Sequence, residues 1–367
     1  LTPSDDPVGA ARALNVSQSL SEGAQYAASR SQAKTMLSRE EDTLQSVVSV
    51  LQNLKTLTVQ AGNGTLTDAD RAALATTIQS NLDQLVGLAN ADDGNGQYIF
   101  AGFKSATVPF AQQAGGGYQF LGDQGQRLMQ VDVARQMPAT DDGRSVFLSV
   151  QGGAGYVTSG SPANTGTGVF SAVSVTDATA ANYGKDFTIS FSGGNYSVQT
   201  QDTPPVVVST GPYTEGTPIT FGGLSMSISG QPADGDSFDV STARNAGTDI
   251  FATLGELVTA LKKPLEGGGA QAQSQLLNAL STANVKITNA HDNVLTIRAS
   301  VGSRMNEIDQ LNSGGEARTL IDKSYLSEIE DLDYYDAISE FTQRQTALQA
   351  AQQTFVQLSG LALFKYL

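Results

Sequence analysis

The chain has 367 residues with 21 basic and 36 acidic side chains, a formal net charge of −15 and an isoelectric point near 4.4. This acidity argues against nucleic acid and against a membrane surface as partners, because both need a basic face. The lack of cysteine excludes disulfides and thiolate metal sites, the single histidine excludes multi-histidine metal sites, and no segment reaches the roughly 20 apolar residues of a membrane span.

Glycine and proline divide the chain into three parts. Residues 112–248 hold 22 of the 38 glycines and 7 of the 11 prolines, and helical periodicity runs on both sides of them. We therefore predict an α+β fold, in which a long antiparallel helical bundle from both chain ends carries an inserted β-rich domain. The predicted domains are a discontinuous helical core (1–111 and 249–330), a β-rich outer domain (112–248) and a C-terminal axial assembly helix (331–367).

The first predicted helix begins at Pro7, which suits the first helical position, with Asp6 as its cap. Gly62-Asn63-Gly64 ends it. Its apolar residues recur at the 3–4 spacing of a coiled-coil seam. They are Leu37, Leu44, Val47, Leu51, Leu54 and Ala61.

A second helix is predicted from Thr67, which forms a capping box with Asp70. The run Asp92-Asp93-Gly94-Asn95-Gly96 closes this helix, and helical patterning returns only at Thr248. Between the two positions, short β-rich runs bounded by turn residues indicate antiparallel sheets. The runs are residues 146–148, 169–175, 187–191, 196–198, 206–208, 219–221 and 226–228.

Three helices are predicted in the C-terminal part. The first contains Ile250, Leu254, Leu257 and Leu261 and stops at Pro264. The second has the most regular heptad pattern of the chain and is broken by Gly314-Gly315. Its seam is Leu280, Ala283, Ile287, Ala290, Val294, Ile297, Val301, Arg304, Ile308 and Leu311.

The last helix, interrupted near residues 331–333, has an unusual composition. From Gln345 to the C-terminus the only charged residue is Lys365, and apolar residues cover more than one helical face. Such a helix must be buried, either by folding back onto the core of its own chain or against other copies or proteins. We favour the second interpretation. The predicted assembly interface is Phe341, Leu348, Phe355, Leu358, Leu363 and Phe364.

No motif for catalysis or cofactor binding is present. Residues 93–97 resemble a calcium loop faintly and fit a turn better, and residues 233–236 fit a hairpin turn at least as well as a metal site. His291 is predicted to flank a long helix without a catalytic role. The carboxylate pairs Glu40-Glu41 and Asp141-Asp142 are interpreted as a helix surface and a turn. We expect no enzyme activity, no metal and no cofactor.

Four segments resemble the flagellin family, and two of them its hook–filament junction proteins. Residues 2–10, with Pro3, Ser4, Asp5, Asp6 and Pro7, resemble the start of the helical core of flagellins and hook-associated proteins. Residues 96–110, with Gly102 and Phe103, resemble the segment after the second helix of the junction proteins. Residues 298–304 resemble the C-terminal core helix of the family, and residues 346–367 resemble the terminal helix of the junction proteins.

The resemblance implies a structural subunit of the bacterial flagellum that forms a ring joining the hook to the filament. Its implied partners are identical subunits, the upstream hook-associated junction protein, flagellin and a cytoplasmic export chaperone. It implies export through the flagellar type III channel to an extracellular position. It also implies a further segment before Thr2, which in the family carries the export signal and pairs with the terminal helix.

Two alternatives stay open. A flagellin filament subunit would share the helical segments and would be distinguished by a high copy number. A surface-displayed binding module would use the helices as a stalk and exposed aromatic residues as a binding face, although cross-strand packing explains such residues better. The candidates for that face are Tyr118, Phe120, Tyr183, Tyr196 and Tyr213.

Overall fold

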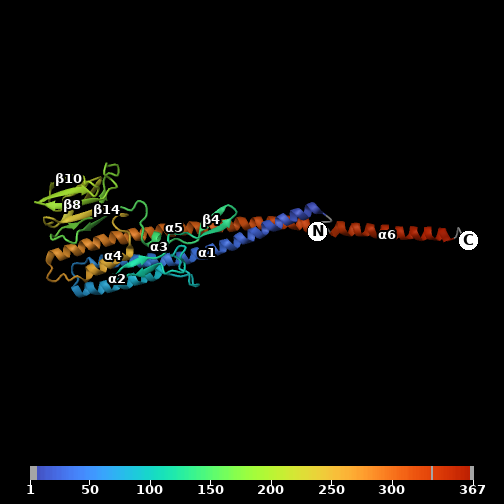
Figure 1. Cartoon of the computed structure of the whole chain (residues 1–367), viewed down its shortest axis with the longest axis horizontal. Helices are drawn as coiled ribbons and strands as arrows, with labels where there is room; N and C mark the ends of the chain where they lie inside the picture. The colour runs from blue at the N-terminus through green and yellow to red at the C-terminus, as the bar shows by residue number, and fades with distance from the viewer. Residues whose placement is uncertain (1–5, 332–333, 364–367) are drawn as a thin grey trace. The chain divides into compact units, whose positions relative to one another are not determined.

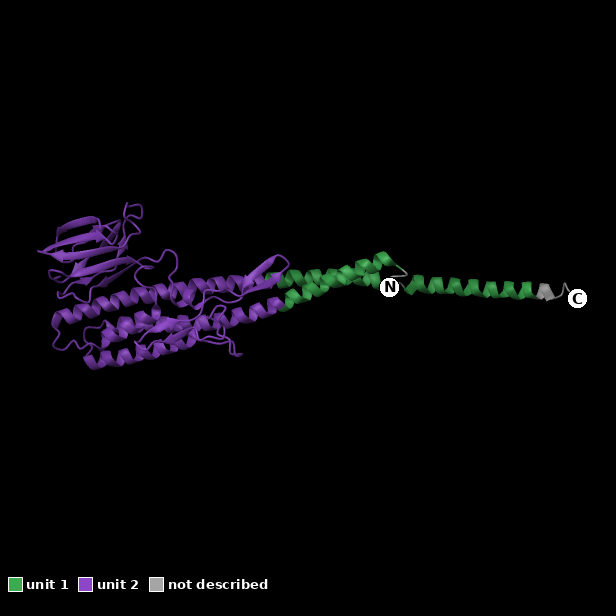
Figure 2. Cartoon of the chain, in the orientation of Figure 1, with its two compact units in different colours: residues 1–28, 310–367 green, residues 29–309 purple. Residues whose placement is uncertain are grey.

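The computed structural model describes residues 6–331 and 334–363, with side chains as far as residue 359. These residues form six α-helices and fourteen β-strands (Figure 1). They belong to two compact units, residues 1–28 with 310–367 and residues 29–309 (Figure 2). The predicted α+β class is confirmed, because long helices come from both flanks and the strands lie between them in sequence. The helices are α1 (Pro7–Ala61), α2 (Asp68–Ala89), α3 (Gly143–Phe147), α4 (Ile250–Lys262), α5 (Gly269–Glu330) and α6 (Tyr334–Leu363).

The helix starts follow the predicted caps. The Asp6 carboxylate accepts hydrogen bonds from the N–H groups of Val8 and Gly9, at 3.1 and 3.0 Å, and Pro7 is the first residue of α1. Thr67 and Asp70 form the predicted capping box of α2. These side chains satisfy N–H groups that have no partner within the helix, which stabilises each start by about 1 kcal/mol.

Helices α1 and α5 run antiparallel. Within residues 29–309, Lys34 pairs with Asp309, Glu41 pairs with Arg298, and Gln52 Nε2 lies 3.5 Å from His291 Nε2. Residue numbers in α1 therefore increase in the direction in which those of α5 decrease. The predicted seam residues of α1 are all buried, as are the five that recur every seven residues in α5. Burial of these apolar side chains is the main stabilisation of such long helices. The five in α5 are Leu280, Ile287, Val294, Val301 and Ile308.

Three local predictions are wrong. Gly314-Gly315 do not break α5, which continues to Glu330; a glycine costs a helix only about 1 kcal/mol relative to alanine, and a long packed helix tolerates that. Residues 146–148 are not a strand. Val146 and Phe147 belong to the short helix α3, which Asp142 caps at its start and Leu148 at its end. Residues 233–236 form a turn but not a hairpin, since β13 and β14 on either side belong to different sheets.

The described strand pairs are all antiparallel, as predicted. The largest sheet has the order β10-β9-β8-β14-β5. Runs 169–175 and 226–228 are each divided between two short strands, and six strands lie outside the predicted runs. The strands are β1 (Phe110–Gln112), β2 (Tyr118–Phe120), β3 (Leu128–Asp132), β4 (Arg135–Pro138), β5 (Tyr156–Gly160), β6 (Val169–Phe170), β7 (Ser174–Val175), β8 (Phe187–Ser192), β9 (Asn195–Thr200), β10 (Val207–Pro212), β11 (Ile219–Phe221), β12 (Leu224–Met226), β13 (Ile228–Ser229) and β14 (Ser237–Thr242).

The sheets from β6 onward share one apolar core. Phe187, Ile189, Val198, Phe238 and Val240 are among its fully buried members, on alternate positions of their strands. Period-2 alternation places these residues on one face of the sheet. The core is therefore made by the insertion's own strands.

Hydrogen bonds join the strands to α5. The Asn278 side chain accepts from the Phe170 N–H at 3.2 Å and donates to the Gly168 carbonyl at 2.9 Å. The Thr282 hydroxyl donates to the carbonyl of Thr158 at 2.7 Å. Side chains on one face of α5 thus satisfy backbone groups in and beside β5 and β6, and these groups would be costly to bury unpaired.

An aromatic cluster packs the segment after α2 against α4. Phe147 lies edge-on to Phe100 and Phe110, with ring centroids 5.4 and 5.6 Å apart, and Phe251 of α4 lies 5.7 Å from Phe147. All four rings are buried. Phe100, Phe110 and Phe147 therefore share one hydrophobic cluster with Phe251 of α4.

Candidate assembly surface

Helix α6 presents the predicted interface residues to solvent. In the described chain Phe341 is 68%, Leu348 59%, Phe355 73% and Leu358 63% exposed. Leu363 is the last residue of α6 but its side chain lies outside the described residues, as does all of Phe364. Four of the six predicted residues can thus be placed, and none of the four packs into the core of its own chain.

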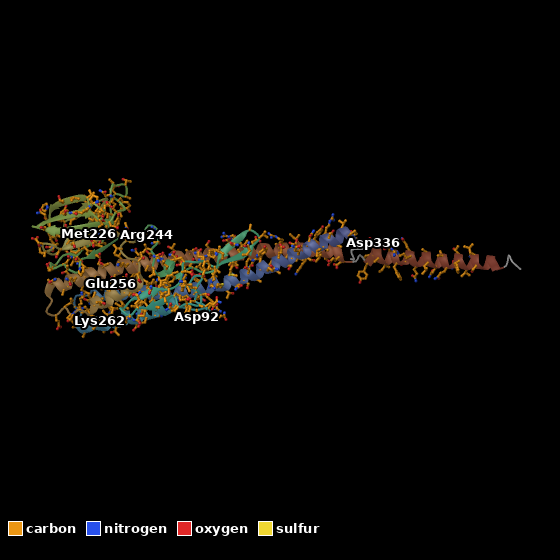
Figure 3. All side chains as sticks on the ribbon, in the orientation of Figure 1. Asp92, Met226, Arg244, Glu256, Lys262 and Asp336 are labelled. Carbon is orange, nitrogen blue, oxygen red and sulfur yellow. The ribbon has the colours of Figure 1, made fainter. Side chains whose placement is uncertain are left out.

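The exposed residues form an apolar stripe along α6. Phe341, Leu348 and Phe355 recur every seven residues, so they lie on the same side of the helix. Figure 3 shows the side chains extending from α6, with Asp336 labelled in its first turn. The last ion pair of the described part of the helix joins Glu340 to Arg344. From Gln345 onward its described side chains are uncharged, so the stripe presents apolar area with little charge around it.

Such a stripe is unfavourable in water. Soluble monomers rarely expose a large contiguous apolar patch, and patches of this kind mark contact sites. A helix that buries no apolar face gains nothing from tertiary packing and depends on its intrinsic propensity alone. The arrangement is therefore suited to contact with other chains.

The predicted family-motif residues have local structural roles where they can be placed. Asp6 caps α1 and Pro7 begins it, whereas Pro3, Ser4 and Asp5 lie outside the described residues. Gly102 has φ +70°. The exposed Phe103 donates its N–H to Asp123 Oδ1 at 2.8 Å.

Asp123 organises the loop that contains Gly102 and Phe103. Its carboxylate also accepts the Gly125 N–H at 2.8 Å, and its own N–H donates to the Ala101 carbonyl at 3.2 Å. The two backbone donors, Phe103 and Gly125, lower the pKa of Asp123 because they stabilise the carboxylate form. Gly102 and Phe103 thus build a loop whose turn depends on Asp123.

The structure brings no catalytic set together in its described part, where no group of three or more His, Asp or Glu side chains could hold a metal ion. His291 Nδ1 lies 3.2 Å from Asp292 Oδ1 on the flank of α5, as predicted. Asp93 accepts the N–H groups of Asn95 and Gln97, which lower its pKa, so its loop is the predicted turn.

A cavity of about 310 Å³ lies between residues 159–168, α4 and α5. Its charged lining side chains are Lys286, Lys263 and Glu256, the last labelled in Figure 3. Lys263 and Glu256 are exposed to solvent. The lining therefore offers no buried acid–base pair of the kind that catalysis uses.

One prediction about the carboxylates is wrong. Glu40 was interpreted as a surface residue, but it is fully buried, and Asp141 ion-pairs with the buried Arg304. The signal was present in the heptad spacing, because Glu40 follows Leu37 by three residues and precedes Leu44 by four. That position belongs to the buried seam of α1.

The five aromatic residues considered for a binding face are engaged in packing. Tyr196 and Tyr213 pack against the core of the strand region, and Phe120 lies 5.2 Å from Phe110. Tyr118 and Tyr183 contact Phe251 and Tyr156, at 5.7 and 6.1 Å between ring centroids. Cross-strand and core packing thus accounts for them, and no aromatic binding face is formed by these five.

Comparison with known proteins identifies the family. The bacterial flagellin N-terminal helical region matches residues 1–105, the flagellin C-terminal helical region matches residues 285–367, and the D2-like domain of flagellar hook-associated protein 1 matches residues 160–242. Flagellar hook-associated protein 3 of Salmonella typhimurium is 31% identical over 99% of this chain and 87% of its own length. The chain belongs to the flagellar hook-associated protein 3 family.

Further members of the hook-associated protein 3 family agree. The Escherichia coli protein of that name is 30% identical over all of this chain and 88% of its own. The crystal structure of the flagellar junction protein FlgL from Legionella pneumophila is 28% identical with a TM-score of 0.74, over 87% of this chain and 99% of its own. The resemblance drawn from the four sequence segments is therefore confirmed, and the α6 stripe lies within the flagellin C-terminal match.

The described helices include none long and apolar enough to cross a membrane.

Proposed function

We propose that the chain is a structural subunit of the hook–filament junction and that α6 is its main assembly element. In this proposal identical copies form a ring between the upstream hook-associated junction protein and flagellin. The observation that carries it is the exposed apolar stripe of α6 in a chain of the hook-associated protein 3 family. Leu363 and Phe364 belong to the interface in this proposal, although they lie outside the described side chains. Relatives bear the names of structural flagellar proteins, and the proposed role requires no enzyme activity.

The same proposal includes the export route of the subunit and the roles of its domains. The subunit leaves the cell through the flagellar type III channel with a cytoplasmic chaperone and acts outside the cell. Residues 1–111 and 249–330 form the helical core, residues 112–248 carry the outer domain, and residues 331–367 form the axial helix. Within residues 112–248, Phe147 packs against Phe251 of α4, so the beginning of this range contacts the helical core. The core of the strand region within residues 170–240 supports an outer domain of its own, since its buried residues come from its own strands.

The test is the double variant Leu348→Asp with Phe355→Asp. Both side chains are exposed in the single chain, so the free energy of unfolding should change by no more than about 0.5 kcal/mol. In the assembled junction each aspartate would be buried without a partner, at a cost of several kcal/mol. We expect the variant to fold normally and to be absent from sheared flagella, with loss of motility.

The matched control is Gln343→Asp with Ala350→Asp. It adds the same charge with the same spacing, half a helical turn away from the stripe, and these positions are also exposed. It should be incorporated better than the stripe variant. Normal incorporation of the stripe variant would contradict the proposal, and so would a large fall in its melting temperature as an isolated chain.

Copy number separates the proposal from the filament alternative. A junction subunit should be a trace component of purified flagella, measured by quantitative mass spectrometry against flagellin. Abundance comparable to that of the filament subunit would favour a flagellin role instead.

A further inference from the structure

Three charged groups lie together where α1, α5 and the segment before α3 meet: Glu40 and Arg304 are buried, and Asp141 is partly buried. Glu40 of α1 is 0% exposed, and its Oε1 accepts the N–H of Asp141 at 3.1 Å. Its second oxygen, Oε2, is buried and has no hydrogen-bond partner among the described residues. An ionised carboxylate would bury an unsatisfied charged oxygen at this point, which is strongly unfavourable.

The cluster holds two acids and one base. Arg304 of α5 ion-pairs with the Asp141 carboxylate and donates a further hydrogen bond to the Pro138 carbonyl at 3.1 Å. Its positive charge is thus balanced by Asp141 alone. If Glu40 were also ionised, the cluster would carry a net negative charge in a site shielded from solvent.

Neighbouring charges have their own partners. Glu41 pairs with Arg298, Asp142 caps α3 through Ser145, and Arg39 acts on Asp93 in the loop after α2. Among the described residues, Asp141 and Arg304 are the charged groups that act on Glu40. No second cation is therefore placed to compensate an ionised Glu40.

We propose that Glu40 is a proton-dependent latch, which holds a proton in the folded chain and loosens the contact between α1, residues 138–142 and α5 when it is ionised. In the protonated form the neutral carboxyl group fits a seam of leucine and valine side chains, and Asp141 and Arg304 remain a balanced pair. In the ionised form two carboxylates compete for one guanidinium.

The direction of the pH effect follows from the same geometry. Burial, followed by the charge of Asp141, raises the pKa of Glu40 from 4.5 to about 8, although Arg304 acts to lower it. The folded chain therefore binds more protons than the unfolded chain between these two values, and stability falls as the pH rises through this window. Below pH 4.5 both states are protonated at Glu40, and above pH 8 both are ionised.

The experiment compares Glu40→Gln with the native chain by urea unfolding at pH values from 5 to 9. Glutamine keeps the shape and remains neutral. We expect similar unfolding midpoints at pH 5. Between pH 5 and pH 9 the ratio of folded to unfolded native chain should fall about a thousandfold relative to the same ratio for the variant.

Glu41→Gln is the matched control, because it removes one carboxylate from the adjacent position, which is only partly buried and paired with Arg298. Its pH profile should run parallel to that of the native chain. If the profile of Glu40→Gln also ran parallel to the native profile from pH 5 to 9, the latch would be refuted.

A second measurement does not depend on the variant folding. In the native chain labelled with ¹³C at glutamate carboxyl carbons, one resonance, that of Glu40, should titrate well above pH 6. Titration of every glutamate below pH 6 would overturn the proposal.

Discussion

Replacement of Gly102 by alanine tests the loop that follows α2. Gly102 has φ +70°, and a Cβ added there would lie 2.3 Å from Asp123 Oδ1 and 2.4 Å from the Asp123 carbonyl oxygen. The backbone conformation alone costs an alanine about 1–2 kcal/mol. The close contact adds the cost of overpacking, about 1–3 kcal/mol, because the Asp123 carbonyl group belongs to the backbone and cannot rotate away as a side chain can. We expect a total loss of about 2–5 kcal/mol.

Gly116→Ala is the matched control. Gly116 has φ +87° and no atom within 4 Å of an added Cβ, so only the conformational cost remains. The two variants are compared by urea unfolding of the full chain, with equal slopes required for a direct comparison. An equal loss of stability in both variants would refute the argument that Asp123 leaves no room for a Cβ at Gly102.

Other variants test the helices and the strand region. Thr67→Ala should cost about 1 kcal/mol in thermal unfolding, because it removes the capping box of α2. Ile287→Ala should cost about 2–5 kcal/mol, whereas Leu320→Ala should stay within about 0.5 kcal/mol, since the two side chains are 0% and 71% exposed. His291→Ala should leave export and motility unchanged in a swimming assay, since it lies on a helix flank; a motility defect at normal export would contradict this. A short linker in place of residues 160–242 should leave cooperative helical melting by circular dichroism, because that segment builds its own core; loss of that melting would show that the helices depend on it.

The helical part of the fold was largely predictable from sequence. The residues that end or cap α1 and α2 act through neighbours within a few positions, so Asp6, Thr67 and Asp70 reveal their roles locally. The heptads also predicted most of the burial in α1 and α5 correctly, because the spacing of apolar side chains determines which face of a helix is hidden. Two predicted seam residues of α5, Ile297 and Leu311, are only half-buried. The family could be recognised for the same reason, since its motifs lie in these helices and the loop after α2.

The strand region was less predictable. Strands β5 and β14 lie outside the predicted runs, and they pair with each other although most of the strand region separates them in sequence. The split of residues 169–175 between β6 and β7 likewise follows from two different partner strands. Local propensity cannot predict a strand boundary that is determined by the partner strand.

Sequence by itself thus determined the long helices, their caps, their buried faces and the family. Tertiary structure decided where residues in those helices depart from what their local pattern predicts. Glu40 was interpreted as a solvated surface charge, yet it occupies a seam position next to Asp141 and Arg304 from distant segments. Gly314-Gly315 stay helical in α5. The physical reason is common to both: local patterns determine what each residue prefers, whereas burial and charge balance depend on neighbours that only the fold brings together.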